Sequence, residues 1–210
     1  HRLGASRLER TICSTAAAAA LGATQGYRYG TEPEQFRHSR LILAWGANIL
    51  GANIHLWPFI AEARRRGARF YTIDPVRNRT GQVSDRHFFV NPGSDAALAL
   101  GMMHVIVAEG LYDEDYVARY TIGFETLRER LWRYPPERAA TLTGLPVADI
   151  VDLAREFATL KPAVIRLNLG VQRNQRGSLA VHAISLLPAL TGSWRHPAGG
   201  LLLTTSGAFR

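Results

Sequence analysis

The chain has 210 residues, 47% of them apolar and 20% charged, a composition typical of a folded domain that buries a substantial core. Its single cysteine, Cys13, excludes an internal disulfide and a cysteine-rich zinc or iron–sulfur site within these residues, and no apolar run approaches the roughly 20 residues of a membrane-spanning helix. The net charge of +8 comes from scattered arginines, with no basic run longer than residues 64–66, so we expect neither a nucleic-acid partner nor insertion into a membrane.

The first predicted helix follows Cys13. Ser14 or Thr15 is a suitable N-cap, and Gly22 is expected to stop the helix. A thiol just before a helix N-terminus has its pKa lowered by the positive end of the helix dipole, whereas a lone cysteine is commonly inert and buried. Both interpretations of Cys13 stay open on the residues alone. Residues 26–39 are polar and predict a loop with a short helix.

Residues 41–79 predict a βαβ unit. An apolar run over residues 41–45 is followed by a helical pattern that ends at Gly67, and a second apolar run covers residues 70–73. Pro58 fits only in the first turn of that helix. Parallel strands joined by a crossover helix indicate an α/β fold, a mostly parallel, doubly wound (Rossmann-like) sheet with extra helices. We expect residues 1–210 to form one such α/β region.

Small and polar residues follow the two strands, at the edge where ligands bind in such sheets. Asp74 ends the second strand, where Rossmann folds place a ribose-binding carboxylate, but no G-x-G-x-x-G follows the first strand. By themselves these residues fit nucleotide binding and a plain crossover equally well. The residues in question are Gly46, Ala47, Asn48, Gly51, Asp74, Pro75 and Arg77.

The rest of the chain predicts a short strand over residues 85–90, a buried helix over 96–109, two amphipathic helices within 111–133 and another helix within 141–159. Ser94 or Asp95 is expected to cap the buried helix. A further buried strand over residues 163–169 leads to a third polar strand end and a helix over residues 178–190, and residues 196–200 are expected to form a turn.

Three motifs occur in order: W-G-A-N at residues 45–48, I-D-P-x-R at 73–77, and N-P-G-S-D-A-A-L-A-L-G at 91–101. Together they resemble the molybdopterin oxidoreductases, the dimethyl sulfoxide reductase and formate dehydrogenase superfamily, over residues 10–200. The resemblance implies that these loops hold molybdopterin guanine dinucleotide, with Asp95 on the guanine base and the loop after the third strand near the pterin. The implied cofactor-binding residues are Trp45, Gly46, Ala47, Asn48, Gly51, Asp74, Pro75, Arg77, Gly93, Ser94, Asp95, Gly170, Gln172 and Arg173.

The resemblance also places R-T-I-C-S-T at the position of the molybdenum ligand, which makes Cys13 the implied metal ligand and catalytic residue. A soft thiolate suits that role. Ser14 stands where the best-known formate dehydrogenases have a histidine, which argues against formate as the substrate. The implied activity is the two-electron oxidation or reduction of a small molecule.

We expect these residues to be part of a longer enzyme. Its other regions would supply an N-terminal iron–sulfur cluster and a C-terminal domain, and electron-transfer subunits are possible partners. The 210 residues alone are therefore expected not to turn over substrate. Two alternatives remain: a scaffold of the same family without molybdenum, like the large iron–sulfur subunit of respiratory complex I, and a generic nucleotide-binding or nucleic-acid-binding module. Cys13 and the three populated loops favour the enzyme, and metal analysis of the full-length protein would discriminate.

Overall fold

A parallel sheet lies at the centre of the computed structural model, which describes residues 4, 14–27 and 29–205. Within these residues five strands are ordered β3-β2-β1-β4-β5, and all neighbouring pairs are parallel. This order confirms the expected doubly wound α/β class, and its switch point lies between β1 and β4. The strands are β1 (Leu41–Trp45), β2 (Arg69–Ile73), β3 (Arg86–Phe88), β4 (Ala163–Leu167) and β5 (Gly200–Leu202).

Strand β1 is the central strand, and all five of its residues are buried. It pairs with β2 on one side and β4 on the other, with Leu41 aligned to both Arg69 and Ala163. Because side chains alternate along a strand, Leu43 and Trp45 enter the larger apolar core, while Ile42 enters the smaller core on the opposite face. Burial on both faces explains why this stretch is apolar throughout rather than alternating.

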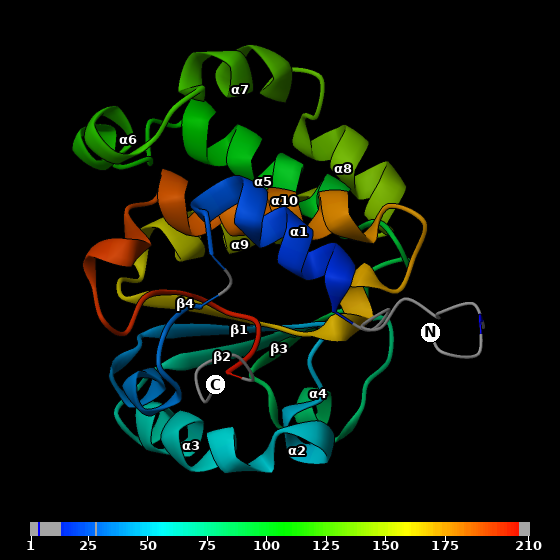
Figure 1. Ribbon diagram of the computed structural model, residues 1–210, viewed down its shortest axis with the longest axis vertical. Coiled ribbons are helices and arrows are strands. Elements are labelled where there is room, and N and C mark those ends of the chain that lie inside the picture. The colour runs from blue at the N-terminus through cyan, green and yellow to red at the C-terminus, as the bar shows by residue number, and fades with distance from the viewer. Residues whose placement is uncertain (1–3, 5–13, 28, 206–210) are drawn as a thin grey trace.

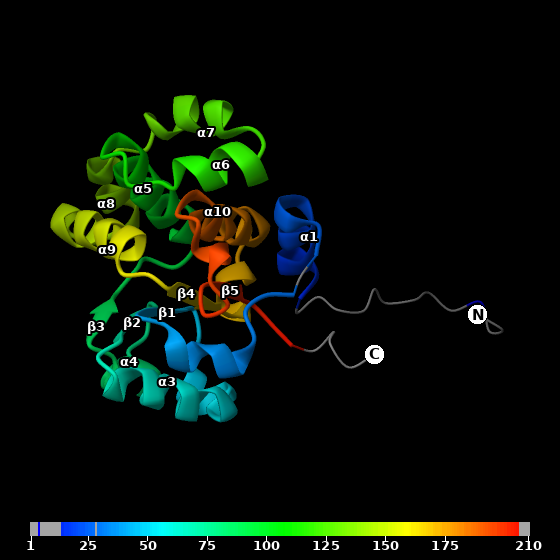
Figure 2. The ribbon, with the colours of Figure 1, turned by 90° about the vertical axis from the view of Figure 1, so that its left-hand side faces the viewer.

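Two helical layers of unequal depth cover the sheet (Figures 1 and 2). Helices α2, α3 and α4 cover one face, and α10 packs between α1 and α5 over the other, with α9 and α8 also packed on α5. The helices are α1 (Thr15–Gln25), α2 (Ile49–Ala52), α3 (Trp57–Arg65), α4 (Arg79–Val83), α5 (Asp95–Ala108), α6 (Glu114–Tyr120), α7 (Phe124–Leu131), α8 (Pro136–Thr143), α9 (Val147–Thr159) and α10 (Gly177–Leu190). Short 3₁₀ helices are η1 (Pro33–His38), η2 (Ile54–Leu56), η3 (Leu169–Gln172) and η4 (Ser193–Arg195).

The βαβ unit predicted within residues 41–79 is confirmed as β1, α3 and β2. Pro58 lies in the first turn of α3, and Gly67 follows the helix with a φ of +90°, a conformation that glycine adopts without a steric penalty. The short α2 and η2 between β1 and α3 were not predicted. Helix α5 is buried over most of its length, as its sequence indicates.

The expected end of the first helix is wrong, and one strand was missed. Helix α1 does not stop at Gly22 but continues to Gln25 and ends at Gly26, whose N–H donates to the carbonyl oxygen of Gly22. An exposed glycine lowers helix propensity without preventing the helix. The turn expected at residues 196–200 is confirmed at residues 196–199, where the N–H of Gly199 donates to the carbonyl oxygen of His196 at 2.9 Å. The chain then enters β5, a strand that was not predicted and that pairs with β4 from Gly200 to Leu202. Three residues are too few to show strand periodicity, so this strand depends on its partner.

Candidate functional site

The ends of β1, β2 and β4 are aligned at one edge of the sheet by hydrogen bonds that extend the strand ladder. The N–H of Gly46 donates to the carbonyl oxygen of Ile73 (2.9 Å), and the N–H of Asp74 donates to the carbonyl oxygen of Phe88 (3.2 Å). On the other side of β1, the N–H of Asn168 donates to the carbonyl oxygen of Trp45 (3.2 Å). The loops that follow these strands therefore begin side by side.

These loops enclose a cleft of about 160 Å³. It brings together seven of the predicted residues from four separate segments: Gly46, Asp74, Pro75, Gly93, Asp95, Gly170 and Arg173. Ile73, Val90, Pro92, Val171 and Asn174 complete the lining. Small-molecule pockets typically have volumes of about 300–1,000 Å³, so this cleft can take a base or a phosphate group rather than a whole dinucleotide.

The cleft depends on backbone segments that approach each other closely. Gly46 has a φ of +56°, and a Cβ atom at this position would lie 2.7 Å from Cγ2 of Val171. A Cβ on Gly170 would lie 3.2 Å from the carbonyl oxygen of Gly46. Gly93, with a φ of +81°, has only Asn174 atoms near its missing Cβ, at 3.8 Å or more. Glycine at residues 46 and 170 thus lets the ends of β1 and β4 touch.

Asp95 is the buried carboxylate of the cleft, with 8% of its surface exposed. The indole N–H of the fully buried Trp45 donates to Asp95 Oδ1 at 2.8 Å. Burial raises the pKa of Asp95 because the charged form is desolvated, and the negative charge of Asp74 raises it further, against the lowering effect of the Trp45 hydrogen bond. Trp45 therefore supports the site by orienting Asp95 and does not itself line the cleft.

Asp74 shapes the loop after β2. Its Oδ1 accepts the N–H of Val76 at 2.8 Å, which closes an Asx-turn, and the Asn78 side chain donates to Oδ2 at a longer 3.4 Å. Arg77, also in this loop, is exposed and does not line the cleft. The loop holds the Asp74 carboxylate at the rim.

Asn48 points away from the cleft. Its Oδ1 accepts a hydrogen bond from Thr80 Oγ1 at 3.1 Å, and a Cβ on Gly51 would lie only 2.4 Å from the Asn48 side chain. The structure thus places the Asn48 side chain against Thr80 of α4, while Gly51 is exposed and Ala47 is buried. Ser94 precedes α5 but does not cap it, because its hydroxyl donates to the carbonyl oxygen of Asn91 at 2.6 Å.

Gln172 connects the loop after β4 to the start of α1. Its side chain is buried, and its Oε1 accepts the N–H of Ala17, in the first turn of α1, at 2.6 Å. A Cβ on Gly177 would lie 2.2 Å from the Gln172 carbonyl oxygen, so Gly177 allows this loop to fold tightly. Cys13 lies outside the described residues, but the helix that follows it is thereby fixed to the loop that carries Gly170 and Arg173.

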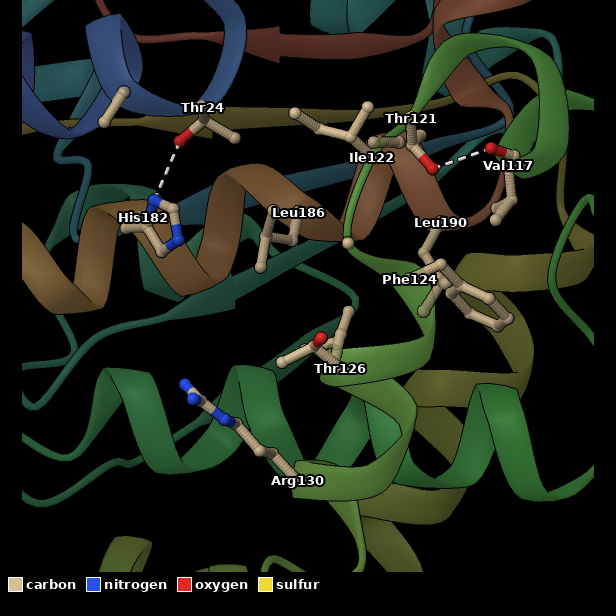
Figure 3. A pocket seen from close by; sticks show the side chains of 14 residues that line it. Thr24, Val117, Thr121, Ile122, Phe124, Thr126, Arg130, His182, Leu186 and Leu190 are labelled. Atoms are coloured by element: carbon tan, nitrogen blue, oxygen red, sulfur yellow. Dashed lines mark hydrogen bonds between the residues drawn. The ribbon is translucent and has the colours of Figure 1, made fainter.

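A second, mainly apolar groove lies apart from the strand ends (Figure 3). It has a volume of about 340 Å³ and is lined by helices α1, α6, α7 and α10 and the residues between α6 and α7. Thr24 Oγ1 and His182 Nδ1 form a hydrogen bond of 3.0 Å at one end, and Phe124 and Leu190 lie toward the other. The Ile122 side chain is fully exposed. No residue of the cleft contributes to this groove.

Comparison with known proteins identifies the family. The family model for molybdopterin oxidoreductase matches residues 3–206. The chain belongs to this family. Its members use a molybdenum–pterin cofactor, and several relatives are named as oxidoreductases, which agrees with the resemblance found in the motifs.

Individual relatives of this molybdopterin oxidoreductase chain extend well beyond it. The chain is 40% identical to the probable oxidoreductase YoaE of Bacillus subtilis over 99% of its own length and 30% of the relative's. It is 31% identical to the assimilatory nitrate reductase catalytic subunit of the same organism, covering 90% of the chain and 27% of that protein. The solved structure of acetylene hydratase from Pelobacter acetylenicus superposes with a TM-score of 0.78 at 32% identity, over 84% of the chain and 24% of that protein. The chain thus spans less than a third of these relatives.

Within the described residues, no group of three or more His, Cys, Asp and Glu side chains could hold a metal ion. No helix in the same part of the chain is both long and apolar enough to cross a bilayer.

Proposed function

We propose that this chain binds molybdopterin guanine dinucleotide and forms part of a molybdenum-dependent oxidoreductase that oxidises or reduces a small molecule by two electrons. The observation that carries the proposal is the buried Asp95 carboxylate at a cleft formed by glycine-rich strand ends. When bound, the molybdenum centre would supply the two-electron exchange with the substrate.

The groups in the cleft fit a guanine nucleotide. A carboxylate can accept two N–H bonds from the edge of guanine, and Asp95 is held in place for this by the Trp45 indole. Asp74 at the rim has the position of a ribose-binding carboxylate. The backbone at Gly46, Gly93 and Gly170 can approach a pyrophosphate closely, because no side chain intervenes.

Arg173 supplies positive charge at the same cleft. It is exposed and lines the cleft, and a guanidinium can bind a phosphate with two parallel hydrogen bonds. Gln172 is occupied in holding α1, so we assign the contact with the cofactor to Arg173 and a positioning role to Gln172. Contacts from Asn48, Gly51 and Arg77 remain predictions, and they would require the cofactor to extend beyond the cleft.

Cys13 is the proposed molybdenum ligand and catalytic residue. It immediately precedes Ser14, the residue at the N-terminal end of α1, and that end is anchored to the loop after β4 through Gln172. This hydrogen bond fixes the first turn of α1 relative to the cleft, and Cys13 comes two residues before that turn in the sequence. The rest of the same enzyme would supply the remaining cofactor contacts and an iron–sulfur cluster, and electron-transfer subunits are the expected partners.

Two substitutions in the full-length protein separate cofactor binding from chemistry. Asp95→Asn should lower the content of molybdenum and guanine nucleotide, because an amide replaces one accepting oxygen with a donor that faces the guanine N–H groups. Asp152→Asn is the matched control, since Asp152 is exposed on α9, and it should leave cofactor content unchanged.

Cys13→Ala should abolish turnover while guanine nucleotide is retained, since the nucleotide contacts lie elsewhere. Normal turnover by this variant would contradict the assignment of Cys13 as the molybdenum ligand and catalytic residue. Unchanged nucleotide content in Asp95→Asn would contradict the assignment of the cleft.

A further inference from the structure

A buried positive charge lies within β4, outside the cleft described above. Arg166 has 7% of its surface exposed and lies opposite Ala44 of β1 and Leu202 of β5 in the sheet. All five residues of β4 are buried, and the other four are apolar. Burying a guanidinium in this setting costs several kcal/mol unless an opposite charge compensates it.

The described residues offer Arg166 only neutral acceptors. Its Nε donates to Asn53 Oδ1 at 3.2 Å, and its Nη1 donates to the backbone carbonyl oxygens of Leu167, Leu202 (3.3 Å) and Leu203 (2.7 Å). No carboxylate within the described part of the chain forms an ion pair with it. Burial lowers the pKa of Arg166 to about 10, with no opposing charge to raise it.

Arg166 lines a cavity of about 690 Å³, which is within the size range of small-molecule sites. The cavity lies between η1, the loop through α2 and η2, and the ends of β4 and β5. Its other polar lining residues are Glu34, Asn53, His55, Asn168, Thr204 and Thr205. Glu34 is exposed and forms no ion pair with Arg166. Gly170 lines both this cavity and the nucleotide cleft, so the two flank the end of β4.

The guanidinium is held in one orientation. Hydrogen bonds at Nε and Nη1 fix its plane, while no hydrogen bond from Nη2 occurs within the described residues. A fixed, desolvated guanidinium at a polar cavity matches a carboxylate or phosphate, because both accept paired N–H bonds and their charge compensates the buried cation.

We propose that Arg166 anchors a second binding site, distinct from the nucleotide cleft, that takes the oxyanion group of a small ligand. The oxyanion can come from an anionic small molecule or from a phosphate of the cofactor, and both present the same chemistry to the guanidinium. The site does not depend on the proposed function, since the charge and the cavity are there whether or not the protein is catalytic.

The test uses the full-length protein and two probes, inorganic phosphate and acetate, titrated calorimetrically at constant ionic strength. We expect saturable binding of at least one probe. The Kd of that probe should rise at least tenfold in Arg166→Gln and only severalfold in Arg166→Lys, which keeps the charge. Arg155→Gln is the control for loss of one arginine, because Arg155 is exposed and paired with Glu109 on the surface. It should bind the probe as the unmodified protein does.

Asn53→Ala provides a second variant should Arg166→Gln fail to fold. It retains the charge but removes the acceptor at Nε, so probe binding should weaken severalfold. Titrating cofactor-depleted and cofactor-loaded protein separates the two sources. Binding to both forms identifies a separate small ligand, and binding to the depleted form alone identifies a cofactor phosphate. Absence of saturable binding in both forms, or equal binding in Arg166→Gln, would overturn the proposal.

Discussion

Replacing Gly46 with alanine should destabilise the domain and separate the ends of β1 and β4. The backbone at this residue has a φ of +56°, which costs a residue with a Cβ atom roughly 1–2 kcal/mol. The new Cβ would also lie 2.7 Å from Val171 Cγ2, and overpacking of this kind adds about 1–3 kcal/mol. The combined loss of about 2–5 kcal/mol corresponds to a fall in Tm of roughly 4–20 °C for a domain of this size.

Gly110→Ala is the matched control. Gly110 has a similar φ of +66°, but no atom lies within 4 Å of the position a Cβ would take. Its substitution therefore carries only the backbone cost of roughly 1–2 kcal/mol. Calorimetric unfolding of both full-length variants gives the difference in Tm, and assays of molybdenum and released guanine nucleotide report on the cleft. Equal Tm values and equal cofactor contents in the two variants would refute the argument that contact between the strand ends maintains the site.

The other predictions concern one carboxylate and two helical glycines. Burial raises the pKa of Asp95 in the folded protein above the usual aspartate pKa of about 3.9. The cofactor-free protein should therefore lose stability as pH rises from about 3.9 through this raised pKa. Asp95→Asn should remove this pH dependence from the denaturation curves. Retention of guanine nucleotide on gel filtration should weaken as pH falls through the raised pKa, since the protonated carboxyl accepts fewer hydrogen bonds; retention independent of pH would contradict this. Gly22→Ala should stabilise the protein by about 0.5–1 kcal/mol, because Gly22 is exposed within α1 with no atom near its missing Cβ. Gly101→Ala should instead destabilise the protein, since the new Cβ would lie 2.5 Å from Ala139 Cβ. Thermal unfolding should show a higher Tm for Gly22→Ala and a lower Tm for Gly101→Ala.

The sequence predicts the strongly patterned part of the fold and fails where structure depends on distant contacts. The central βαβ unit could be identified because its strands are continuous apolar runs bounded by glycine and by Asp74-Pro75. Strand β5 could not, because three residues after Gly199 become a strand only by pairing with β4. The predicted end of α1 at Gly22 was wrong for a related reason. Whether a glycine ends this helix depends on the packing of the whole helix against α10.

The candidate site shows the same division. The topological rule for parallel sheets correctly brings Gly46, Asp74, Gly93 and Gly170 to one cleft. It does not predict side-chain directions, which is why Asn48 faces Thr80. Arg166 did carry a sequence signal, since an arginine inside an otherwise apolar strand is unusual, but its isolation from carboxylates is visible only in three dimensions.

The position of β1 in the sheet has a consequence for synthesis of the protein. Its partner β2 follows closely in the chain, but Ala163, which pairs with Leu41, is made about 120 residues later. At roughly 5–20 residues per second, some 6–24 s separate the emergence of these two strands from the ribosome. During that interval one edge of the apolar segment 41–45 has no strand to pair with, and unpaired apolar edges promote aggregation. The strand that organises the finished sheet therefore keeps one apolar edge unpaired until a late part of the chain is made.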